Sequence, residues 1–350
     1  MTSLWMRTCR LVIVGVWLAA AGYTSAFAQQ EPLRVAATVP ELGSLARAIG
    51  GAQVTVIVFA KGTEDAHFVE AKPSFIKDLS AADVYIQSGL ELEVGWAPVL
   101  LHNARNSKVL PGAPGYVDAA EVITPLEVPT GPVDRSMGDV HPAGNPHYLT
   151  DPLNGLRVAQ LLRDRFSALR PAHRASFAEH YTAFRQRVGA ALVGEPLAQK
   201  YDVEKLALLF EHGRLGAFLQ SQGETPLLGG WLGTMVPYAG TKAVADHNLW
   251  PYFARRFGLT LRGFMEPKPG VPPTTKHLQE LVQTMQAEKI GIILTSVYYD
   301  PRHAQFLAQH TGAKAVAMAH QVGARAGTEE YLRMVEYNVR QLAAALGARQ

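Results

Sequence analysis

The sequence has 350 residues, which exceeds one typical domain and predicts about two. Its composition, 48% hydrophobic and 18% charged residues, is that of a globular protein able to bury a sizeable core. The formal net charge of +3 becomes +1 when the two arginines of the N-terminal segment described next, Arg7 and Arg10, are subtracted. A nearly neutral chain without a basic run gives no reason to predict nucleic acid as a partner.

Residues 1–28 have the pattern of a cleaved secretory signal peptide. A basic start is followed by an apolar run at 11–22, too short to span a bilayer, and by the small-x-small site Ala26-Phe27-Ala28. Cys9 precedes the apolar run, whereas a lipidated cysteine would follow it. We therefore expect export to the periplasm without a lipid anchor.

Cys9 is also the only cysteine of the chain, so the mature protein is expected to have no thiol. Disulfides and cysteine metal ligands are then excluded. Any metal ion must be held by histidine and carboxylate side chains.

The first half of the chain alternates predicted strands and helices. Apolar, β-branched runs indicate strands at 33–39, 54–59, 83–87 and 109–110, and amphipathic segments indicate helices at 41–49, 73–82 and 92–103. This alternation is typical of βαβ units and therefore of a parallel sheet. A long connection rich in proline and glycine follows at 112–138.

A single extended helical pattern runs from Leu153 to about Leu192 and is expected to bend near Pro171. Up to forty helical residues would span roughly 60 Å, enough to join two domains. Beyond it, strands are predicted at 242–245, 259–264, 290–295 and 315–319, with helices at 249–257, 274–287, 301–310 and 329–346. Residues 197–240 are not assigned.

The sequence thus predicts an α/β protein with two Rossmann-like lobes of parallel sheet joined by a long helix. The expected boundaries are a signal peptide at 1–28, an N-terminal lobe at 29–152, the linking helix at 153–195 and a C-terminal lobe at 196–350. Ligands of such sheets bind beyond the carboxyl ends of the strands.

The loop at 139–152 contains two histidines, two aspartates, three prolines and a glycine within fourteen residues. Proline and glycine set the backbone, so His141 and His147 are expected on a stiff loop. Neutral imidazole suits zinc and similar ions. Exposed loop histidines without a ligand would give the same pattern.

His67 follows the second predicted strand, and His247 follows the first strand of the second lobe. Together with His147 they could converge in the cleft between the lobes. A metal site needs such convergence, with three or four ligands about 2.0–2.1 Å from one ion. Two lobes that close over an ion can also trap it. Taken singly, each of these histidines could equally be an ordinary loop residue.

Several segments together carry a family resemblance. They lie at 37–42, 64–67, 72–74, 79–83, 88–93, 145–152, 246–247 and 252–259. On these segments, and from about Arg34 to the C-terminus, the chain resembles the zinc- and manganese-type solute-binding proteins of ABC metal importers.

The resemblance implies that His67, His147 and His247 are metal ligands. It also implies two α/β lobes with a rigid linking helix and the metal site in the cleft between them. The partner would be an integral-membrane permease, to which a monomer delivers a divalent transition metal captured in the periplasm.

The fourth ligand departs from the family pattern. The family commonly has an aspartate after the last strand of the second lobe, whereas residues 316–323 include no carboxylate. His320, His141 and Glu266 are the candidates, and water could also complete the shell. The family's usual proline before the first histidine is Ala66 here, and the long histidine-rich loop of many zinc importers is absent.

Histidine-dominated coordination favours Zn²⁺ over Mn²⁺, which prefers carboxylate oxygen. A manganese-type carrier remains the alternative within the family. The usual order of affinities of divalent metals does not by itself exclude copper or nickel.

A second class of function is a secreted zinc hydrolase, with Glu64, Glu266 or Asp300 as general base beside a metal-bound water. Neither a His-Glu-x-x-His nor a Gly-x-Ser-x-Gly motif occurs in the sequence. We therefore expect no enzyme. Nothing in the sequence argues for a third class, an adhesin.

Overall fold

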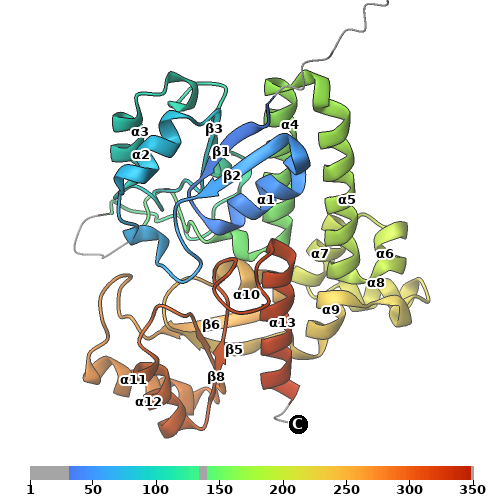
Figure 1. The fold of residues 1–350 in the computed structure, drawn as a ribbon. Helices are drawn as coiled ribbons and strands as arrows, with labels where there is room; N and C mark the ends of the chain where they lie inside the picture. The colour runs from blue at the N-terminus through green and yellow to red at the C-terminus, as the bar shows by residue number, and fades with distance from the viewer. Residues whose placement is uncertain (1–30, 134–139, 348–350) are drawn as a thin grey trace, which may run out of the picture. The chain divides into compact units, whose positions relative to one another are not determined.

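Two parallel four-stranded sheets organise the computed structural model, which describes residues 31–133 and 140–347 (Figure 1). The predictions made on the signal peptide, Cys9 and Asp139 lie outside the described residues. No helix within the described ranges is long and apolar enough to cross a bilayer.

The first sheet has the strand order β2-β1-β3-β4, and all of its pairings are parallel. Its central strand is apolar because helices cover both faces, as in other parallel sheets. Val35 lies in register with Val56 on one side and Val84 on the other. The elements of this lobe are β1 (Leu33–Ala37), α1 (Pro40–Gly50), β2 (Val54–Val58), α2 (Pro73–Ser80), β3 (Val84–Gln87), α3 (Ala97–Ala104) and β4 (Tyr116–Asp118).

Two predictions in this lobe are corrected. The strand expected at 109–110 is wrong, because Val109 is buried at the end of a 3₁₀ turn (Ser107–Val109) and the fourth strand is β4. The helix expected at 92–103 begins only at Ala97. Before it, Gly89, Leu90 and Glu91 have φ of 78°, 50° and 65°, a left-handed turn that no helix can include. The strand β4 lies within the connection from 112 to 138, which was expected to be irregular throughout.

The linking segment forms two helices, α4 (Pro152–Leu169) and α5 (Arg174–Val193). The bend predicted near Pro171 is a reversal of the chain through the short 3₁₀ turn Pro171–His173, and α4 and α5 lie side by side (Figure 1). Proline lacks the N–H that would continue α4. The twenty-residue α5 contacts α1 in the first lobe and α9 (Gly230–Met235) in the second, so it is the long helix that joins the lobes.

The second lobe repeats the topology, with the strand order β6-β5-β7-β8. The previously unassigned residues form short helices before it. The elements are α6 (Glu195–Lys200), α7 (Val203–Glu211), α8 (Leu215–Ser221), α9, β5 (Thr241–Ala245), α10 (Pro251–Phe257), β6 (Leu259–Phe264), α11 (Thr275–Ala287), β7 (Ile292–Thr295), α12 (Pro301–Thr311), β8 (Lys314–Ala317) and α13 (Tyr331–Gly347).

Buried polar contacts tie the two lobes together within one compact unit that begins at Pro32. The Arg256 guanidinium of α10 donates to both oxygens of Asp151, the N-cap of α4, at 2.9 and 2.8 Å. The Glu41 carboxylate of α1 accepts the Val322 N–H at 3.0 Å. One apolar core also runs through both lobes and the linking helices. The domain boundaries at 152 and 195 remain predictions.

Candidate metal centre

Five histidines from both lobes lie close together beyond the carboxyl ends of the strands. They are the five residues singled out in the sequence: His67 after β2, His141 and His147 in the connection between β4 and α4, His247 after β5, and His320 after β8. The strand order brings these loops to one place, as expected for paired α/β lobes.

His67, His147 and His247 form a triangle of imidazole rings. Their ring centroids are 5.2 Å (His67 to His147), 6.2 Å (His67 to His247) and 6.0 Å (His147 to His247) apart. A tetrahedral zinc ion with nitrogen ligands about 2.0–2.1 Å away would hold imidazole centroids roughly 5 Å apart. The triangle is thus close to the spacing that a shared ion requires, and slightly wider.

Both histidine candidates for the fourth ligand adjoin this triangle. The Nε2 atom of His141 lies 3.1 Å from Nε2 of His67, close to the roughly 3.3 Å between two nitrogen ligands of one tetrahedral ion. The His320 ring lies 4.9 Å from that of His147, between centroids. The third candidate, Glu266, is instead hydrogen-bonded to His247.

The ring nitrogens that face away from the triangle have partners. Nδ1 of His67 lies 2.7 Å from the Asp65 carboxylate, and Nδ1 of His247 lies 2.5 Å from that of Glu266. A carboxylate on one imidazole nitrogen fixes the ring and leaves the other nitrogen as the stronger ligand. Glu266 is itself held by the Gly270 N–H at 2.9 Å.

The two rival histidines have neutral partners. Nδ1 of His320 lies 3.2 Å from the Tyr298 hydroxyl, and the His141 ring is hydrogen-bonded to the Leu90 carbonyl. Their rings are oriented as well, but by groups that do not raise the basicity of the imidazole as a carboxylate does.

An Asp or Asn just before each histidine of the triangle holds its backbone. The Asp65 side chain accepts the His67 N–H at 3.0 Å, and the Asp246 side chain accepts that of His247 at 2.8 Å. Asn145 does the same for His147 at 2.9 Å. These local turns were overlooked in the sequence, although the pairs Asp-x-His, Asn-x-His and Asp-His could have revealed them.

Burial keeps three of the five imidazoles neutral. It lowers the pKa of His147 well below 6.5, that of His141 to about 4 and that of His320 to about 3, and neighbouring histidines add to the shift of each. Metal ligation requires neutral imidazole, so these three rings can bind an ion at neutral pH without first releasing a proton.

The five rings are not spaced as they would be around one bound ion. Among the described residues, no group of three or more His, Asp or Glu side chains could hold a metal ion in its present position. The centroid distances explain why: the triangle is wide on its His247 sides, and His67 and His141 are bonded to each other. Small ring shifts would be needed to close the site.

A cleft of about 240 Å³ opens onto the cluster from both lobes, bounded by Glu127, His141, His147, His247 and Asn248. The other predicted acids have partners elsewhere: Glu64 pairs with Lys61 at 3.2 Å, and Asp300 caps α12 and pairs with Arg302.

Comparison with known proteins gives a consistent result. The family model described as "Zinc-uptake complex component A periplasmic" (ZnuA) matches residues 35–222 and 233–345. The metal ABC transporter substrate-binding lipoprotein ScbA of Streptococcus cristatus is 20% identical over 97% of this chain and 99% of its own length.

Two solved structures share the fold. The crystal structure of ZnuA is 21% identical, has a TM-score of 0.65 and matches over 90% of this chain and 99% of its own. The Mn-bound periplasmic metal-binding protein of candidatus Liberibacter asiaticus is 15% identical, with a TM-score of 0.64, over 89% of this chain and 98% of its own.

The family model covers most of the chain, and the fold of two parallel sheets joined by a long helix agrees with it. The family comprises substrate-binding proteins of metal ABC transporters and not enzymes, so the hydrolase alternative is not supported. This protein belongs to the zinc-uptake complex component A family of periplasmic metal-binding proteins.

Proposed function

We propose that the protein captures Zn²⁺ in the periplasm and delivers it to the integral-membrane permease of an ABC importer. His67, His147 and His247 serve as ligands, and His141 or His320 completes a tetrahedral shell. The observation that carries this proposal is the triangle of buried rings, two of which are oriented by carboxylates.

Zinc is preferred because all the ligands of this proposed shell are imidazole nitrogens, whereas manganese favours carboxylate oxygen. Asp65 and Glu266 are engaged with ring nitrogens and support the ligands from outside. A manganese-type carrier is the alternative, since one structural relative is described as Mn-bound.

The proposal includes a cleaved signal peptide at 1–28, no lipid anchor and a monomeric mature chain. The position of Cys9 before the apolar run supports the absence of an anchor, although the relative from Streptococcus cristatus is named a lipoprotein.

The test is elemental analysis with zinc titration of the mature protein and of H67A, H147A and H247A, with H212A as a control at an exposed helix end. We expect about one zinc per wild-type chain and an affinity loss of orders of magnitude in each of the three variants. H212A should bind as the wild type does.

The variants H141A and H320A identify the fourth ligand. Only the loss of the true ligand should weaken zinc binding as much as H67A, H147A and H247A do. Wild-type affinity in H247A would refute the three-histidine site. Stronger binding of Mn²⁺ than of Zn²⁺ would favour the manganese alternative.

A further inference from the structure

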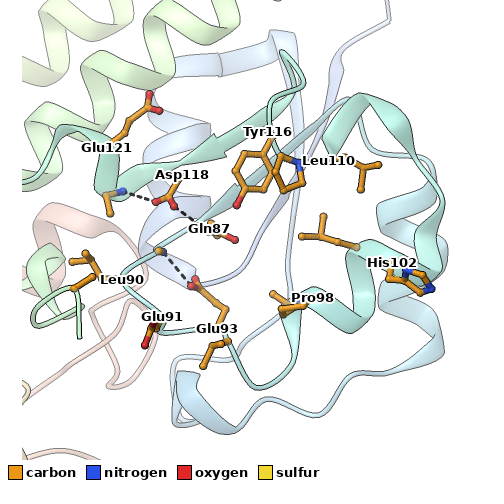
Figure 2. A pocket seen from close by; sticks show the side chains of 17 residues that line it. Gln87, Leu90, Glu91, Glu93, Pro98, His102, Leu110, Tyr116, Asp118 and Glu121 are labelled. Atoms are coloured by element: carbon orange, nitrogen blue, oxygen red, sulfur yellow. Dashed lines mark hydrogen bonds between the residues drawn. The ribbon is translucent and has the colours of Figure 1, made fainter. Parts of the chain in front are cut away.

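A cavity in the N-terminal lobe lies away from the histidine triangle. It has a volume of about 820 Å³ and lies between α3, the ends of β3 and β4, and the turn at 89–91 (Figure 2). Ligand pockets are typically about 300–1,000 Å³ in volume, so the cavity is large enough for a small organic molecule.

The cavity wall is mainly apolar. Ala97 and Leu101 of α3 are buried in this wall, while Pro98 and Leu110, which are labelled in Figure 2, are exposed. Apolar walls with few polar groups are the usual lining of small-molecule sites.

The polar groups of the wall are mainly acidic. Glu91, Glu93, Asp118 and Glu121 line the cavity together with Gln87, Tyr116 and His102, and among the described residues its lining includes no lysine or arginine. Glu121 is bonded to Arg165 outside the lining, and the buried Glu93 accepts two backbone N–H groups and the Thr38 hydroxyl.

Asp118 is the carboxylate best placed to bind a ligand. It ends β4, accepts the Ala120 N–H at 3.0 Å and the Gln87 amide at 3.1 Å, and pairs with no lysine or arginine of the residues that the structure describes. Tyr116 lies two residues before it on the same face of the strand, and its ring borders the cavity (Figure 2). A carboxylate beside an aromatic ring is a favourable environment for an ammonium group.

From this combination we propose that the cavity is a second binding site, which takes a small organic cation with an apolar body. The ammonium group is held by Asp118 and the Tyr116 ring, and the body packs against Leu101, Pro98 and Leu110.

The electrostatics agree with an uncompensated negative charge. Burial raises the pKa of Tyr116 to about 12, and the Asp118 and Glu93 carboxylates add to the shift. Burial also raises the pKa of Asp118. A bound cation would offset both effects.

The experiment compares 2-naphthylmethylamine, a cation at pH 7, with 2-naphthylmethanol, its neutral analogue of the same shape. Each is titrated into the zinc-loaded, ¹⁵N-labelled protein while amide shifts are followed. We expect the amine to shift amides around Gly89, Ala97 and Ala120 and to bind about tenfold or more tightly than the alcohol, because a hydrogen bond to a charged group adds roughly 1.5–3 kcal/mol.

The variant D118N should bring amine binding down to the level of the alcohol. D78N removes the same charge from an exposed position of α2 outside the cavity and should leave amine binding unchanged. Zinc content and melting temperature establish that both variants are folded.

Three results would overturn the proposal: no shifts at the cavity up to the solubility limit of the amine, equal affinity for the alcohol, or equal losses in D118N and D78N.

Discussion

Each histidine of the triangle is held at its backbone by a preceding Asp or Asn, and two of the three are also held at the ring. His247 shows both devices, with Asp246 on its N–H and Glu266 on Nδ1. The imidazole is thereby fixed before an ion arrives, which reduces the entropy lost on binding.

Glu266 should therefore matter without being a ligand. We predict that E266Q weakens zinc binding roughly 10–100-fold, the usual effect of removing a carboxylate behind a ligating histidine, and less than H247A does. Competition with a chromophoric chelator measures this. E280Q, at an exposed position of α11, is the control, and a loss in E266Q as large as in H247A would mean that Glu266 itself ligates the ion.

The lowered pKa values determine the pH at which zinc is released in acid. Protons compete with metal for imidazole, so affinity falls as pH falls. Burial lowers the pKa of His141 to about 4 and that of His320 to about 3, and it also lowers that of His147, so protons compete for these three rings only at unusually low pH.

To the extent that these three rings set the affinity, we expect zinc binding to change little between pH 8 and about 5 and to fall steeply as pH approaches 4. Equilibrium dialysis over this range measures it. Release that follows the ordinary histidine pKa of 6.5 would contradict buried, neutral ligands.

At the level of elements, periodic segments were predictable and turns were not. β6 was expected at 259–264 and is Leu259–Phe264, because β-branched and apolar residues end at a glycine and proline-rich stretch. β4 was missed because Tyr116 and Val117 are too short a run to stand out among glycines and prolines. Leu90 and Glu91 have a left-handed backbone conformation that is usually adopted by glycine. The local sequence therefore does not predict this turn.

The candidate site, too, was predictable from the sequence only in part. The five histidines could be named because loops after parallel strands are where ligands bind, and the family resemblance selected three of them. Their partners Tyr298 and Leu90 depend on tertiary packing between distant loops and could not be read from the sequence.

The contact between α10 and the start of α4 supports a stability prediction. Arg256 is buried between Asp151 and Glu211, with N–O distances of 2.8 and 2.7 Å. Removing Arg256 leaves the buried Asp151 carboxylate without its ion-pair partner, while Glu211 keeps Arg255, so R256M should lower the free energy of unfolding by about 3–5 kcal/mol.

Urea denaturation of the metal-free protein measures this loss. R262M, which removes a half-exposed partner of Glu288, should cost much less than R256M, because solvent screens an exposed ion pair. Similar losses in the two variants would mean that the buried cluster contributes no more than a surface ion pair.

In the whole molecule, a buried ionisable side chain lies where the two lobes meet. Glu41 of α1 is buried against the loop after β8, and burial raises its pKa from 4.5 to about 8. Between these values the folded protein holds a proton that the unfolded chain releases. Stability from this group is therefore complete below about pH 4.5 and is lost as pH rises towards 8.

We predict that E41Q, which stays neutral, reduces the loss of stability between pH 5 and pH 8 by a few kcal/mol. Urea midpoints of the metal-free wild type and variant at the two pH values test this, with the exposed E70Q as control. An unchanged pH dependence in E41Q would show that Glu41 is ionised in the folded protein.

The candidate ligands are spread along the chain from His67 to His320, on loops of both lobes. No fragment that emerges early from the ribosome contains the whole set, and an unfolded chain holds them too far apart to act together. If the proposed site is correct, a chain that crosses the membrane unfolded cannot take cytoplasmic zinc with it. Folding after export would then decide in which compartment the protein is loaded.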